Sequence, residues 1–253
     1  MNRRGMLSWL GVSAAGALRP ISSAMASECK EGRQIVALES FCAKDVDHLP
    51  RLHSYLSQTL QPAMEQIHSV PSVYMEAIIA PQAPQVLAFT NYQSFEEMFA
   101  VSGRISSQPE VRQARALLES AHALEGVQSQ VLVASEGLRV AADAARLRNG
   151  IFELCSYYAP AWHDGPSARV TEVFNRAGIC PIANALFAPG EHLSRFTFLI
   201  PFESLGASIE AWAKLDADAE WGALQRESSV RYGSGVKLTA KAIYKLTPYS
   251  RLA

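Results

Sequence analysis

The sequence predicts an α+β fold in which two successive βαββαβ halves of one chain pack their sheets together as a barrel. Strand-like and helix-like hydrophobic periods run twice along the chain in the same order. Landmark residues recur about 110 residues apart: Glu39 and Glu153 are separated by 114 residues, and Pro81 and Pro189 by 108. A four-stranded sheet with helices on one face also needs a second sheet to cover its other face.

The composition excludes several classes of partner. The chain has 253 residues, of which 49% are hydrophobic, enough to bury a sizeable core. Its 23 basic and 24 acidic residues give a formal charge of −1. Because no positive excess exists to neutralise phosphates, we expect no nucleic-acid partner. Beyond residue 26, charged residues interrupt every apolar stretch before it reaches the roughly 20 residues that a membrane span needs. We therefore expect no membrane-spanning helix in that part of the chain.

Residues 1–26 have the layout of a signal peptide. Two adjacent arginines precede an apolar stretch over residues 6–18, and small residues fit cleavage after Ala26. The arginine pair favours the twin-arginine export route, with the Sec route as the alternative. Cleavage would leave 20 basic and 24 acidic residues. We therefore expect an exported protein, periplasmic or secreted.

The first half begins with a strand and a helix. Residues 34–42 are apolar and strand-like, and residues 45–68 carry apolar side chains every three to four positions, which predicts a core-facing helix. Strand-like runs follow at 73–79 and 86–92. The prolines in the segment 80–84 indicate a turn between them, so the two strands are predicted to form a hairpin.

A second helix and a fourth strand complete this half. Ser94 is placed to cap the helix, with Glu97 three residues later as in a capping box. The helical pattern continues toward His122 with an interruption near residues 106–109. Residues 127–135 then predict the closing strand.

The second half repeats this order after Gly150. Its predicted elements are strand 151–158, helix 167–177, strand 179–187, strand 195–202, helix 204–227 and strand 236–246. Each half is thus a ferredoxin-like unit. The predicted domains are 27–136 and 150–253, joined by a linker at 137–149 that includes a short helix over 140–147.

Several segments of the second half carry a family resemblance: residues 151–157, 201–205, 211–213, 218–221 and the tail 246–252. They resemble the NIPSNAP family, whose domain belongs to the dimeric α/β barrel folds, and the first half resembles it more faintly. Phe198 and Ile200 stand where that family often has a histidine and a tryptophan, and an arginine is replaced near Ser208. The resemblance therefore implies the fold more than an activity.

The first strand of each half supplies candidate site residues. Alternation places Glu153, Cys155 and Tyr157 on one face of their strand, and Glu39 is the equivalent of Glu153. If both carboxyls faced a shared barrel interior, they would raise each other's pKa and provide a general base. The alternative, which we favour, is that Glu153 forms a cross-strand ion pair with a lysine such as Lys241 on the last strand.

Two further polar residues are candidates for ligand contact. His163 lies in a strand-to-helix loop beside a tryptophan and an aspartate, although a histidine in such a loop is more often solvated. Asn184 lies in an otherwise apolar strand and would either face a pocket or bond a neighbouring backbone group. Aromatic residues of the second half would line a cavity or, as we favour, pack in the core: Phe196, Phe198, Phe202, Trp212 and Trp221.

The cysteine pattern indicates neither a metal site nor a defined disulfide. The four cysteines, at positions 29, 42, 155 and 180, show no CxxC or Cys/His spacing typical of metal ligands. We expect no metal and no cofactor. An exported protein permits disulfides, but buried thiols are the favoured interpretation.

Three functions are consistent with these residues. The favoured one is the binding of a small apolar molecule in the barrel interior. The alternatives are a cofactor-independent oxygenase or isomerase, by analogy with other dimeric α/β barrel proteins, and a non-catalytic interaction module whose interior is filled. The sequence permits a homo-oligomer but does not establish one.

Overall fold

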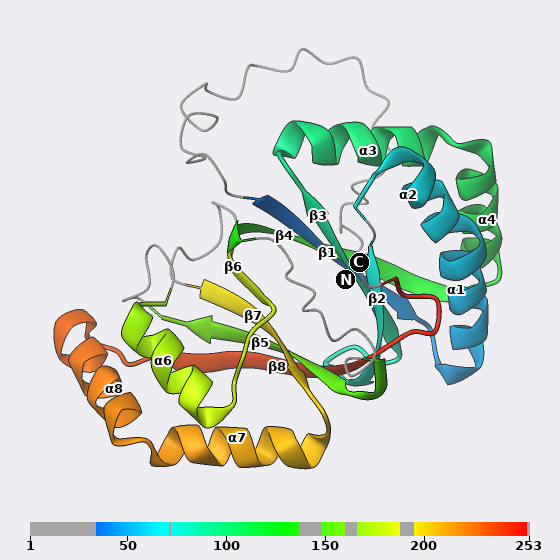
Figure 1. Ribbon diagram of the computed structural model, residues 1–253. Helices are drawn as coiled ribbons and strands as arrows, with labels where there is room; N and C mark the ends of the chain where they lie inside the picture. The colour runs from blue at the N-terminus through cyan, green and yellow to red at the C-terminus, as the bar shows by residue number, and fades with distance from the viewer. Residues whose placement is uncertain (1–33, 71, 137–147, 160–165, 188–194, 252–253) are drawn as a thin grey trace, which may run out of the picture. The chain divides into compact units, whose positions relative to one another are not determined.

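The computed structural model describes residues 34–251 except residue 71 and the segments 137–147, 160–165 and 188–194 (Figure 1). These residues belong to one compact unit. The predicted signal peptide, the linker helix and His163 lie outside the described residues. Within the described part, no helix is long and apolar enough to cross a bilayer.

The first half follows the predicted order of elements. They are β1 (Gln34–Ala43), η1 (Val46–His48), α1 (Leu49–Tyr55), the π-helical η2 (Leu56–Leu60), α2 (Gln61–Ile67), β2 (Val73–Ile79), β3 (Gln85–Tyr92), α3 (Phe95–Ser107), α4 (Pro109–Ser120) and β4 (Leu124–Glu136). The predicted helix over 45–68 is thus one helical run of changing pitch. The predicted interruption lies at Gln108, between α3 and α4.

The second half also keeps the predicted order. Its elements are β5 (Ile151–Tyr158), α6 (Ala168–Ala177), β6 (Ala183–Phe187), β7 (Arg195–Phe202), α7 (Leu205–Ala217), α8 (Ala219–Tyr232) and β8 (Lys237–Leu246). The second predicted strand of this half, over 179–187, begins later than expected, at Ala183. The helix before it ends where predicted, with Gly178 in the left-handed conformation at φ of 82°.

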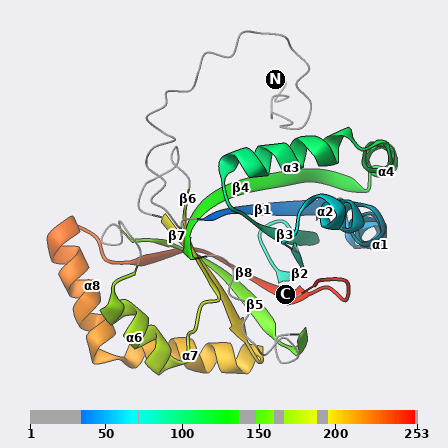
Figure 2. The same cartoon turned by 45° about the horizontal axis from the view of Figure 1, so that its top comes forward.

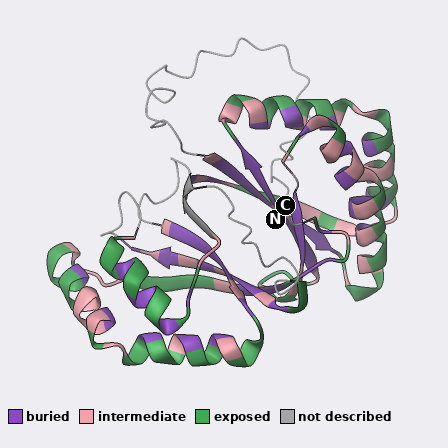
Figure 3. Ribbon diagram, viewed as in Figure 1, coloured by how far each residue is buried: buried purple, intermediate pink, exposed green. Residues whose placement is uncertain are grey.

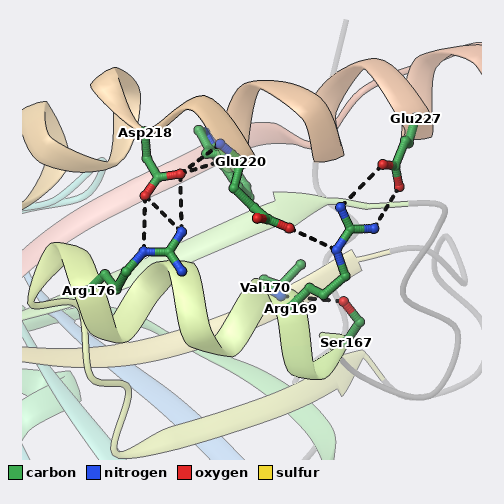
Figure 4. Close-up of polar contacts among 8 residues, drawn as sticks. Ser167, Arg169, Val170, Arg176, Asp218, Glu220 and Glu227 are labelled. Atoms are coloured by element: carbon green, nitrogen blue, oxygen red, sulfur yellow. Dashed lines mark hydrogen bonds and ion pairs between the residues drawn. The ribbon is translucent and has the colours of Figure 1, made fainter.

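The predicted helix over 204–227 is two helices. Asp218 follows α7 with an extended backbone. Its carboxylate accepts hydrogen bonds from the N–H groups of Glu220 and Trp221, so it caps the start of α8. The same carboxylate pairs with Arg176, and Arg169 pairs with Glu220 and with Glu227 (Figure 4). These contacts tie α8 to α6 along their exposed sides.

The strands close into one antiparallel barrel in the order β1-β3-β2-β8-β5-β7-β6-β4. Within each half the fourth strand lies beside the first, the first beside the third, and the third beside the second. The halves join where β2 pairs with β8 and β4 pairs with β6. Barrel closure therefore comes from hydrogen bonds between edge strands as well as from packing of the two inner faces.

Three apolar clusters account for the core. Helices α1–α4 pack on one side of the first four strands, and α6–α8 on one side of the last four (Figure 2). The third cluster contains side chains of both halves and fills the barrel interior with residues such as Leu38, Phe89, Phe152 and Leu199. Figure 3 shows the burial along the strands and on the helix sides turned to them. The aromatic residues Phe196, Phe198, Phe202 and Trp221 belong to the second helix-covered cluster, with Trp212 packed against it.

Candidate functional site

Glu39 and Glu153 face the helices of their own halves, which corrects the expectation of a shared barrel interior. On β1, Ile35, Ala37 and Phe41 belong to the helix-covered cluster, and Glu39 shares their alternation. Glu153 contacts α7 directly, as described below. The packed interior lies between the two carboxyls, so they do not form a pair.

Glu153 is fully buried and its carboxylate is satisfied on both oxygens. Ser208 Oγ donates to Oε1 at 2.5 Å, and Trp212 Nε1 donates to Oε2 at 2.7 Å. Lys241 Nζ on β8 lies 2.8 Å from Oε1 and 5.1 Å from the centre of the Trp212 ring. The cross-strand ion pair that we favoured is therefore present.

The other helix-facing residues of β5 are buried and keep their protons. Burial raises the pKa of the Cys155 thiol to about 12, with a further contribution from the charge of Glu153. Burial likewise raises the pKa of Tyr157, whose ring packs 5.9 Å from Phe198 and 6.4 Å from Trp212. This face of the second half is a packed polar-aromatic core in which the Cys155 thiol and the Tyr157 hydroxyl stay protonated.

Glu39 lies in a different setting. In the strand register it stands opposite Ala88 on β3, and Ala88 in turn stands opposite Tyr74 on β2. The three side chains thus share one row on the helix-facing side, with the smallest in the middle. In the second half the residue opposite Glu153 is Ile200, which is fully buried. The first half therefore has a short side chain where the second has a branched one.

The helices and the last strand of each half extend this difference. Counted from the capping serine of each helix, Met98 in α3 stands where Ser208 stands in α7. On β4, Val127 pairs with the residue that lies two positions after Glu39 on β1. In the same way, Lys241 on β8 pairs with the residue that lies two positions after Glu153 on β5. The positions that supply a hydroxyl and an ammonium to one carboxylate are apolar around the other.

Glu39 is partly exposed and has no hydrogen-bond or ion-pair partner among the residues that the structure describes. Burial raises the pKa of its carboxyl, and the positive charge of Arg115 opposes the rise. Burial also raises the pKa of Tyr55 on α1 to about 12, to which the charge of Glu39 adds. Glu39 is thus a carboxyl that holds its proton more tightly than usual.

Buried hydroxyl groups lie on the same helix-covered side. Ser72 Oγ and Thr90 Oγ1 are 2.7 Å apart. Hydrogen bonding by Ser72 and by Thr90 partly offsets the rise in pKa that burial causes at Tyr74 and Tyr92. The helix-covered side of the first half therefore carries one partly exposed carboxyl and several buried hydroxyls.

A second polar group at this side was not predicted. His53 on α1 lies with Nε2 2.9 Å from Glu76 Oε2 on β2, and with Nδ1 2.9 Å from the hydroxyl of Tyr249. Tyr249 is 196 residues away along the chain from His53. No sequence spacing reveals such a contact, although Tyr249 lies in the tail segment that carries the family resemblance.

The remaining predicted site residues stay untested. The backbone of Asn184 lies in β6 opposite Phe198, and its side chain is outside the described part, as is the whole of His163. Cys42, Cys155 and Cys180 are free thiols. Within the described ranges, no three His, Cys, Asp or Glu side chains gather as a metal site.

Comparison with known proteins shows the fold alone. A proposed monooxygenase of Fusobacterium nucleatum subsp. nucleatum matches with a TM-score of 0.51 at 7% identity, over 86% of this chain and 94% of that chain. A chlorite dismutase variant from Candidatus Nitrospira defluvii gives 0.50 at 10% identity, over 85% and 92%. These similarities agree with the α+β fold that the sequence predicted. No family model and no curated protein sequence matches the chain.

Proposed function

We propose that the protein binds a small, largely apolar molecule carrying a hydroxyl group on the helix-covered side of the first half, with Glu39 accepting that hydroxyl. One observation carries the proposal: of two carboxyls at equivalent strand positions, Glu153 has four protein partners and Glu39 has none among the described residues. An unpaired, partly exposed carboxyl beside the short Ala88 side chain is therefore a group available to a ligand.

A catalytic version of the same site is the second candidate. A general base works best when its pKa lies near the working pH, and burial moves the pKa of Glu39 upward in that direction. In a cofactor-independent oxygenase or isomerase, Glu39 would take a proton from the bound molecule and leave its electron pair on the substrate oxygen.

The binding of 2-naphthol, compared with naphthalene, tests the proposal. Glu39→Gln is expected to weaken 2-naphthol binding by about 10- to 100-fold, the loss of one charge-assisted hydrogen bond, and to leave naphthalene binding unchanged. Ala88→Ile is expected to weaken the binding of both probes, because the larger side chain fills the space beside Glu39. Glu110→Gln, at an exposed position on α4, is the matched control. Wild-type protein that binds neither probe, or that does not distinguish them, contradicts the proposal.

We further propose that the chain is an exported NIPSNAP-type protein whose ferredoxin-like halves arose by tandem duplication. The same strand order in both halves and the layout of residues 1–26 support this. Expression in a bacterium with a twin-arginine pathway should yield periplasmic protein whose first residue is Ser27. Uncleaved protein in the cytoplasm would contradict the export part.

A further inference from the structure

An apolar strip runs along the outer side of α7, the exposed side of this helix in Figure 3. Four apolar residues follow one another at intervals of four positions, and all are exposed: Leu205, Ile209, Ala213 and Ala217. The two large side chains, Leu205 and Ile209, are 47% and 62% exposed. Because residues four apart lie on one side of a helix, these side chains form one continuous surface, the α7 strip.

Two opposite charges lie along one edge of the α7 strip. Glu210 and Lys214 are exposed, and each follows a residue of the strip by one position. Neither forms an ion pair with another residue that the structure describes, whereas both arginines of α6 are paired with acidic residues at α8. Asp216, the third charged residue of α7, precedes a residue of the strip and so lies along its other edge. The first edge therefore presents one acid and one base about one helical turn apart.

The equivalent helix of the first half has the apolar residue without this pair of charges. Counted from the capping serines, Phe99 in α3 stands where Ile209 stands in α7, and Phe99 is 58% exposed. Ala100 and Arg104 stand at the positions of the acid and the base. This edge of α3 carries a base and no acid, so it does not complement a copy of itself.

We infer that the α7 strip is the contact surface of a homodimer, in which α7 packs antiparallel against α7 of a second copy about a two-fold axis. A two-fold contact is self-complementary: if residue i meets residue j of the partner, then j meets i. In an antiparallel pair centred near the middle of α7, Glu210 of each protomer faces Lys214 of the other. Two ion pairs then flank an apolar contact, in which the small Ala213 lets the two helices approach closely.

The charges beside the strip favour a second copy as its partner. A partner surface of one sign would attract one of the two charges and repel the other, whereas a second copy supplies both signs at the required spacing. A single helix pair buries less than the about 1,200 Å² at which standard protein complexes begin. The dimer is therefore expected to be weak, and to dissociate on dilution and at high salt.

Sedimentation velocity of the whole protein at increasing concentrations tests the dimer. The wild type is expected to change from monomer to dimer as its concentration rises. Ile209→Ser is expected to weaken dimerisation about 10-fold, because it removes the largest apolar contact from both copies. Phe99→Ser is the matched control, since it removes a similarly exposed apolar side chain at the equivalent position of α3, and it should leave dimerisation unchanged.

Charge reversal tests the antiparallel pairing. Glu210→Lys and Lys214→Glu are each expected to weaken dimerisation about 10-fold, because like charges then face each other across the axis. An equal mixture of these two variants should regain dimers, because one protomer then presents two lysines and the other two glutamates. A protein with both substitutions should dimerise like the wild type. Glu110→Lys, at an exposed position on α4, controls for the change in net charge.

Three results would overturn the inference. The first is wild-type protein that remains monomeric at millimolar concentration. The second is a loss of dimers in Phe99→Ser as large as that in Ile209→Ser, and the third is a mixture of the two charge variants that regains no dimers. Circular dichroism of each variant shows whether it has kept its fold, so that loss of the contact is distinguished from loss of the structure.

Discussion

Glu39 affects stability through the proton that it holds. Because burial raises its pKa above the usual 4.5, the folded protein binds that proton more tightly than the unfolded chain does. The stabilisation is fully present below pH 4.5 and is lost as the pH rises through the raised pKa. Glu39→Gln should therefore raise the thermal midpoint at neutral pH and leave it unchanged below pH 4.5, as calorimetry at both pH values can measure.

Glu153→Gln provides the comparison at the equivalent position. It leaves Lys241, which is 31% exposed, without its anion, and it changes a carboxylate that accepts from two side chains. The expected loss is about 2 kcal/mol of unfolding free energy at neutral pH, below the range for a fully buried pair because water reaches the lysine. Equal effects of the two substitutions would contradict the different roles given to Glu39 and Glu153.

The sequence predicted one of these residues better than the other. The Glu153–Lys241 pair follows from alternation and strand order, both visible in the sequence. The side of β1 on which Glu39 lies cannot be read from the sequence, because both faces of this strand are apolar. Val36 and Leu38 point into the barrel. Ile35 and Ala37 point to the helices. When both faces of a strand are buried, alternation cannot tell which one the helices cover.

At the scale of elements, the start of α3 was predicted and the break between α7 and α8 was missed. The cap at Ser94 is present, with its Oγ accepting from the N–H of Glu97, while Glu97 Oε2 accepts from the N–H of Gln93. The break at Asp218 was missed because the apolar period runs through it. The capping aspartate itself was the available signal.

The cap of α3 has an effect beyond that helix. Glu97 Oε1 lies 3.5 Å from Nδ1 of buried His68, which stacks on Tyr92 at 4.8 Å. Ser94→Ala should lower the unfolding free energy by about 1 kcal/mol, measured by urea denaturation. Ser107→Ala, at an exposed position on the same helix, is the control and should cost less. Equal losses would contradict a specific capping contribution.

At the scale of the molecule, closure of the barrel makes the halves depend on each other. The shared inner cluster and the β2–β8 and β4–β6 ladders would be exposed if either half opened. Unfolding is therefore expected to be a single transition. Three of the four tryptophans, Trp162, Trp212 and Trp221, lie in the second half. Tryptophan fluorescence and far-ultraviolet circular dichroism should give the same midpoint, and two separate midpoints would contradict this interdependence.

The covalent join between the halves has an evolutionary consequence. In an assembly of two identical subunits, every substitution occurs twice, so a residue that rigidifies one copy must rigidify the other. A single polypeptide has no such symmetry requirement. Glu153 can therefore keep its ion pair with Lys241 while a substitution at or around Glu39, opposite Ala88, leaves that pair unchanged.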